Sequence, residues 1–103
     1  MLFERNENRQ NFKLEITKFF MDWDFSNGPM YPFHKRDMID IIAGIKQKIK
    51  EFTPHLQYID YHTFGESIIF GFSWEGEGVS VEVNINPVSE ENKDKFRALF
   101  RWK

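Results

Sequence analysis

The chain contains no cysteine among its 103 residues. Disulfide bonds, a cysteine nucleophile and cysteine-ligated zinc are therefore excluded. Apolar runs are also short: the stretch from Ile68 to Phe72 includes Gly71 and is far below the roughly 20 residues that a membrane span needs. The first ten residues are charged and lack the apolar segment of a secretory signal. We therefore expect a cytoplasmic protein with no membrane partner.

Motifs for metals, phosphates and nucleophiles are lacking as well. The three histidines, His34, His55 and His62, show no spacing typical of a metal site. The segment Gly71–Glu75 begins like a nucleophile elbow but lacks the final glycine that this motif requires. A net charge of −2 supplies no strong basic patch for a nucleic acid. We predict no metal, no cofactor and no nucleic-acid partner.

Aromatic residues, in contrast, are abundant. They make up 17% of the chain and include twelve phenylalanines. Each such ring can bury about 150–250 Å², so a few positions can build a core. The length is typical of one domain. We predict a single domain over residues 1–103, in which the polar residues 1–10 form a loose N-terminal arm.

Hydrophobic periodicity predicts most of the elements. Residues 35–52 follow the spacing of an amphipathic helix, with Gly44 in the middle where it would permit a close contact. Residues 56–64, 66–75 and 78–86 alternate as strands, joined by turns at Gly65 and Gly76. A last helix is expected over about 90–102, with Ser89 as its N-cap.

Residues 11–25 fit two interpretations. As a strand they alternate apolar and polar side chains, with one bulge near Thr17. As a helix they place five apolar side chains on one stripe and leave Leu14 and Met21 on the other side. Aromatic and β-branched residues favour the strand. The predicted fold is therefore α+β, a single small domain with an antiparallel β-meander of three to four strands and two helices in the order β-α-β-β-β-α.

Charge is unevenly distributed along the chain. Between Asp60 and Asp94 there are eight acidic residues and one basic residue, which gives this stretch −7 and the remainder +5. The acids flank the predicted hairpin of the last two strands. An acidic surface attracts a basic protein and repels a phosphate backbone. We predict that the partner-binding residues are Asp60, Glu66, Trp74, Glu75, Glu77 and Glu82, with Trp74 as an anchor if its ring is exposed.

Asp60 and His62 form the best acid–base candidate, because residues two apart on a strand share a face. An aspartate can orient an imidazole for proton transfer. The plainer interpretation is a polar outward face, with Ile59 and Tyr61 turned inward. Catalysis would require Asp60, His62 and Glu66 to converge in a concave pocket. We assign no catalytic residues and do not predict an enzyme.

Three functional hypotheses follow. The first is a small acidic protein-binding module that inhibits or neutralises a basic partner, in the manner of an immunity protein or antitoxin, for example against a nuclease toxin. A nuclease presents a positive cleft to phosphates, and an acidic domain can occupy it. The alternative is a structural or accessory subunit that forms a homo-oligomer through an aromatic surface. The third, a small enzyme that uses Asp60 and His62, is the weakest.

Overall fold

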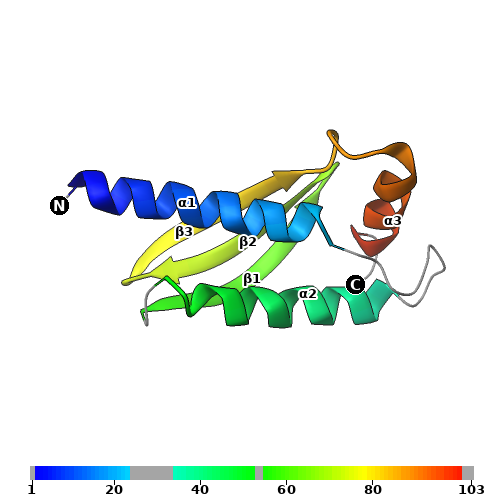
Figure 1. Ribbon diagram of the computed structural model, residues 1–103. Coiled ribbons are helices and arrows are strands. Elements are labelled where there is room, and N and C mark those ends of the chain that lie inside the picture. The colour runs from blue at the N-terminus through cyan, green and yellow to red at the C-terminus, as the bar shows by residue number, and fades with distance from the viewer. Residues whose placement is uncertain (1, 24–33, 53–54, 101–103) are drawn as a thin grey trace.

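A computed structural model describes residues 2–23, 34–52 and 55–100 of the chain (Figure 1). Within these residues there are three helices and one three-stranded sheet. The elements are, in chain order, α1 (Leu2–Met21), α2 (His34–Ile49), β1 (Leu56–Phe64), β2 (Ser67–Trp74), β3 (Glu77–Asn84) and α3 (Glu90–Phe100). The α+β class is confirmed, while the order is α-α-β-β-β-α and differs from the predicted one at its first element.

The sheet is an antiparallel meander in the order β1-β2-β3, as the sequence predicts. The turn between β2 and β3 consists of Glu75 and Gly76, with φ angles of 52° and 88°. Two consecutive positive φ angles characterise a type I′ turn, whose twist matches that of the flanking strands. Glycine adopts such an angle at little steric cost, and this explains why Gly76 occupies the second position.

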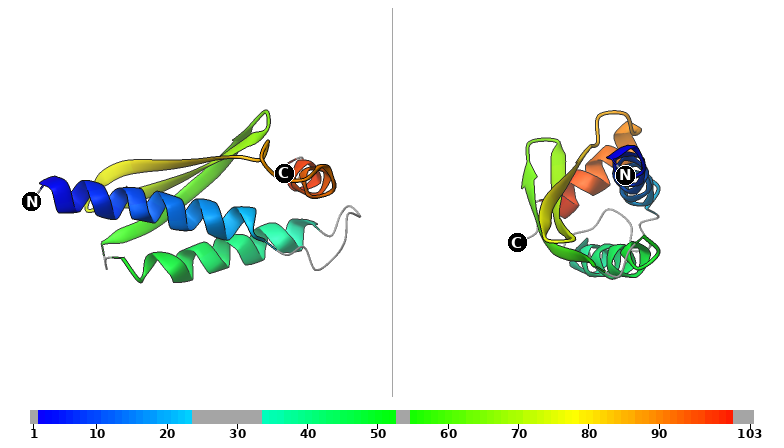
Figure 2. Two further views of the ribbon diagram at one scale, coloured as in Figure 1. Left: turned by 45° about the horizontal axis from the view of Figure 1, so that its top comes forward. Right: turned by 90° about the vertical axis from the view of Figure 1, so that its left-hand side faces the viewer.

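All three helices lie on the same face of the sheet (Figures 1 and 2). α1 and α2 run along this face, while α3 closes the end of the core near the β1–β2 turn. The ring centroids of Phe96 on α3 and Phe20 on α1 are 4.9 Å apart. At the start of α3 the Ser89 hydroxyl accepts a hydrogen bond from the Asn92 amide at 3.4 Å, so Ser89 is the N-cap.

The predicted first strand is wrong: residues 11–21 belong to helix α1. Phe12, Ile16 and Phe20 are fully buried at successive i, i+4 positions, and Leu14 is 66% exposed. This is the stripe of the helical interpretation. The strand pattern needed a bulge to rejoin its two halves, whereas the helical stripe is continuous. Burial of that stripe on the sheet outweighed the β preference of the aromatic residues.

The segment predicted as a loose arm, residues 1–10, is helical from Leu2 onward, because α1 begins at that residue. This segment has no apolar period, but glutamate, arginine and glutamine are good helix formers. Side-chain contacts also hold the helix close to the sheet at Arg9, as shown below. The sequence also predicts a loop over residues 26–33, and these residues lie outside the described part of the chain. None of the described helices is both long and apolar enough to cross a membrane.

Candidate functional site

The second face of the sheet carries no helix in the part of the chain that the structure describes (Figures 1 and 2). Side chains alternate between the two faces of a strand, so every residue that does not point at the helices points to this side. The register then defines one surface across the three strands. We call it the open face; its members are Gln57, Asp60, His62, Phe64, Ser67, Ile69, Gly71, Ser73, Gly78, Ser80, Glu82 and Asn84.

A bulge in β1 determines which residues reach the open face. Tyr58 pairs with Phe72 and Asp60 pairs with Gly71, so Ile59 is the extra residue. Tyr58 and Tyr61 consequently both face the core, where their rings contact Phe72 and Phe70. Ile59 is 59% exposed, and the prediction that it turns inward is wrong. Asp60 and His62 share the open face, as predicted.

Asp60 and Glu82 are the two predicted acids that lie on the open face, and they belong to opposite edge strands. Asp60 pairs with Gly71 of the central strand, and Glu82 pairs with Ile69 two positions away. Both side chains are exposed. The Asp60 carboxylate lies over Gly71: its Oδ1 atom is 2.8 Å from the point that a Cβ atom at Gly71 would occupy. Negative charge therefore lies over the middle of the sheet as well as at its margin.

Glu66 lies at the β1–β2 turn and is bound within the protein. Its carboxylate accepts hydrogen bonds from Nε of Arg97 at 3.1 Å and from Nη2 at 2.9 Å. The hydrogen bond to Glu66 raises the pKa of the Arg97 guanidinium further above its usual value. These two hydrogen bonds from one guanidinium connect α3 to the β1–β2 turn. Glu66 does not join Asp60 and His62 in a shared pocket, as catalysis by these three residues would require.

Glu77 and Trp74 lie at the opposite end of the sheet, and both contact Arg9 of α1. Arg9 donates a hydrogen bond from Nη2 to the Glu77 carboxylate at 2.6 Å, and its guanidinium carbon lies 5.8 Å from the Trp74 ring centroid. Trp74 is only 4% exposed, and its ring packs against Phe12, with the two ring centroids 5.4 Å apart. The condition for its predicted role as an anchor, an exposed ring, is therefore not met.

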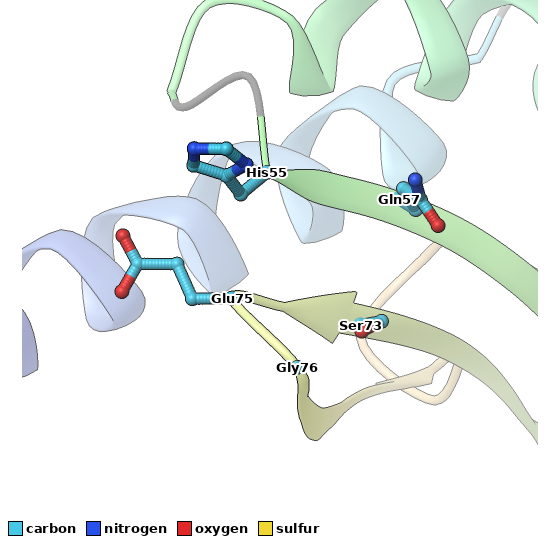
Figure 3. A pocket seen from close by; sticks show the side chains of 5 residues that line it. All are labelled: His55, Gln57, Ser73, Glu75 and Gly76. Atoms are coloured by element: carbon cyan, nitrogen blue, oxygen red, sulfur yellow. The ribbon is translucent and has the colours of Figure 1, made fainter.

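Glu75 lies in the β2–β3 turn, where its amide donates a hydrogen bond to the carbonyl of His55 at 3.1 Å. A cavity of about 500 Å³ at this end of the strands is lined by His55, Gln57, Ser73, Glu75 and Gly76. Figure 3 shows that the His55 and Glu75 side chains extend beyond the ends of β1 and β2 in the same direction. The cavity continues the open face, because Gln57 and Ser73 are a cross-strand pair on it.

The six predicted residues thus occupy three places. Asp60 and Glu82 are on the open face, Glu66 is at one end of the sheet, and Trp74, Glu75 and Glu77 are at the other end. At about 3.3 Å per residue, the eight residues of β2 separate these ends by roughly 25 Å. The single acidic hairpin surface suggested by the sequence is therefore divided by the fold.

The lysines and arginines that the structure describes belong to the helical layer rather than to the strands. Residues 55–89, which include all three strands, contain five acids and no lysine or arginine, so this segment carries −5 and the rest of the chain +3. In the described chain every lysine and arginine lies on a helix or directly after one, as Lys50 does. The helical layer covers the opposite face of the sheet, so the open face has acidic groups and no lysine or arginine of its own.

Sequence reasoning missed the exposed apolar side chains beside these acids. Phe64, at the end of β1, is 79% exposed, and it shares the open face with Asp60 and His62. Its alternation with the half-buried Tyr61 is a signal that could have identified it. Ile59 could not have been found this way, because its exposure depends on the bulge. Large exposed side chains of this kind are typical anchors in protein interfaces.

The described residues contain no group of three or more histidine, aspartate or glutamate side chains arranged to hold a metal ion. Comparison of the chain with protein-family models, with curated proteins and with solved structures finds no match. Its function therefore has to be inferred from the geometry and charge of its surfaces.

Proposed function

We propose that this protein is a small binding module that docks a basic protein partner on its open face and neutralises it, in the manner of an immunity protein or antitoxin. The observation that carries the proposal is the separation of charge between the two layers. The strands and turns hold five acids without a lysine or arginine, and the cations of the described residues lie with the helices. The rest of the chain holds fourteen cations and eleven acids, so a basic partner is attracted more strongly to the open face than to the helical side.

The open face combines charge with apolar contact area. Asp60 and Glu82 supply the long-range attraction that speeds association. Phe64 supplies apolar surface that water leaves on binding, with an exposed fraction of 79%. The bulge residue Ile59, next to Asp60 in the chain and 59% exposed, adds to it. Interfaces are typically built in this way, with a few large anchors among polar groups. A nuclease toxin is a suitable partner, since its active-site cleft must be positive to bind phosphates.

A second copy of the chain fits the open face less well. Stacking two such faces would bring two copies of Asp60 and Glu82 together, and like charges in an interface cost free energy. The aromatic surface expected for a homo-oligomer is also small. Among the aromatic side chains that the structure describes, only Phe64 is mainly exposed. The basic partner is therefore the better proposal, and a cytoplasmic location without a cofactor is part of it.

The test is affinity capture from a lysate of the source cells, washed at low and then at high salt. The bait is the whole chain, either unchanged, with Asp60→Lys and Glu82→Lys together, or with the control change Asp40→Lys. Asp40 is an exposed acid on α2, on the helical side. The captured protein is then purified, and its enzymatic activity is measured with increasing amounts of the module.

We expect one basic protein to be retained at low salt and released at high salt. The double variant should lose it, and the Asp40→Lys variant should keep it. At an equimolar ratio of module to partner, only a small fraction of the partner's enzymatic activity should remain. Capture that survives both high salt and the double change would contradict the proposal. Sedimentation that shows a stable dimer through the open face would replace it with self-association.

A further inference from the structure

Gly71, on the central strand, is the feature of the open face that most directly affects its charge. A Cβ atom at this position would lie 2.8 Å from Oδ1 of Asp60 and 3.6 Å from its backbone oxygen. Real Cβ atoms do not approach other heavy atoms as closely as the first distance. The absent side chain of Gly71 therefore leaves the space into which the Asp60 carboxylate leans.

The position of this carboxylate matters for binding. Gly71 pairs with Asp60 on one side and with Ser80 of β3 on the other, so an acid and a hydroxyl flank a site without a side chain. In the next row Ile69 lies between His62 and Glu82. A long cationic side chain approaching the middle of the sheet would meet acceptors on both sides of Gly71. Once the partner covers the face, exclusion of water strengthens that ion pair.

We propose that the Asp60 carboxylate, seated over Gly71, holds a lysine or arginine side chain of the basic partner, and that Gly71 is a positioning residue for it. This inference rests on the proposed function and specifies its contact point. The occupant is a basic segment of a protein because the strands and turns around the Asp60 carboxylate have no lysine or arginine of their own. An added methyl group at Gly71 would push the carboxylate outward and toward solvent.

The experiment uses a hexa-arginine peptide as the probe and the whole chain labelled with ¹⁵N. Amide shifts are followed in a low-salt titration of the native protein and of Asp60→Asn, Gly71→Ala and the double variant. The control is Gly78→Ala, which adds the same methyl group to the open face of β3, where nothing lies within 4 Å of the new atom. Thermal unfolding of each variant shows whether the fold is retained.

We expect the largest shifts at the amides of Asp60, Gly71 and Ser80. Asp60→Asn and Gly71→Ala should each weaken peptide binding by about two- to fivefold, the usual range for one exposed ion pair. Gly78→Ala should bind as the native protein does. In the Asp60→Asn background, Gly71→Ala should have no further effect, because a positioning residue acts only through the group that it positions.

Equal effects of Gly71→Ala and Gly78→Ala would overturn this inference, and so would an effect of Gly71→Ala that persists without the Asp60 charge. Shifts confined to the turn acids or to α3 would overturn it too, although the captured partner could still depend on Glu82 and Phe64. If the peptide shifts no residue of the strands while capture of a basic protein succeeds, the inference fails and the proposed function stands. If both experiments are negative, both proposals fail. If Gly71→Ala does not fold, the peptide titration of Asp60→Asn alone decides whether the Asp60 carboxylate is the contact point, and unchanged binding would overturn the inference.

Discussion

The ring of Phe19 on α1 fills the space that a side chain at Gly44 of α2 would need. A Cβ atom at Gly44 would overlap Cζ of Phe19 and would lie 3.2 Å from two further ring carbons. The two helices that cover the sheet therefore touch through a glycine and an aromatic ring. The sequence indicated a close contact at Gly44 but not its partner.

Gly44→Ala should destabilise the protein by about 1 kcal/mol. Alanine favours a helix by up to about 1 kcal/mol over glycine, but overpacking of a filled contact costs about 1–3 kcal/mol. Urea unfolding followed by circular dichroism measures the difference. The Phe19→Leu background is the control: without the distal ring carbons, the same alanine should stabilise. A stabilising Gly44→Ala in the native background would show that the helices do not pack this closely.

Glu66→Gln should loosen α3 and leave partner binding intact. The Glu66 carboxylate holds Arg97 of α3 through the hydrogen bonds at 2.9 and 3.1 Å, and both side chains are 36% exposed. Exposed pairs contribute about 0–1 kcal/mol, so global stability should change little. Amide hydrogen exchange in α3 should nevertheless become faster. Glu91→Gln, an exposed acid on the same helix, is the control; equal exchange in the two variants would contradict the role of Glu66.

Glu75→Asn should stabilise the protein by about 0.5–1 kcal/mol. Glu75 has a φ of 52°, which is unfavourable for most side chains, whereas asparagine tolerates this region and Asn-Gly is the preferred type I′ turn. The midpoint of urea unfolding measures the gain. Glu77→Asn serves as the comparison and should destabilise, since it removes the hydrogen bond with Arg9 in an extended segment. A loss of stability in Glu75→Asn would show that contacts of the glutamate outweigh its backbone strain.

The free energy of unfolding should fall between pH 10 and 12. Burial, followed by the nearby Tyr61 and Asp60, raises the pKa of Tyr58 from 10.0 to about 12. The folded state thus keeps a proton that the unfolded state has lost, so the stabilisation is complete below pH 10 and is lost as the pH rises toward 12. Urea midpoints at pH 9 and 11 test this. Tyr58→Phe should reduce the loss and Tyr61→Phe should keep most of it; an identical loss in the Tyr58→Phe variant would exclude Tyr58 as its cause.

Local pattern predicted the elements whose apolar period was unambiguous. The strands, the tight turns at Gly65 and Gly76, helix α2 and the Ser89 cap all follow from side-chain spacing and backbone preference. Residues 11–21 carried two periods at once, and propensity favoured the wrong one. The choice between them depends on burial against the sheet, which is a tertiary quantity. Helix α1 formed because its stripe of Phe12, Ile16 and Phe20 packs into the core.

The candidate site, like the fold, was predictable from the sequence only in part. The sequence by itself determined that the strands and turns would be acidic and free of lysine and arginine, because composition does not depend on folding. Only the tertiary structure decided which acids face the partner. Glu66 and Glu77 form hydrogen bonds with arginines of helices that are distant in the sequence. The bulge at Ile59 and the missing side chain of Gly71 determine the position of the Asp60 carboxylate. Contacts between residues far apart in the chain depend on packing, and a linear pattern does not encode them.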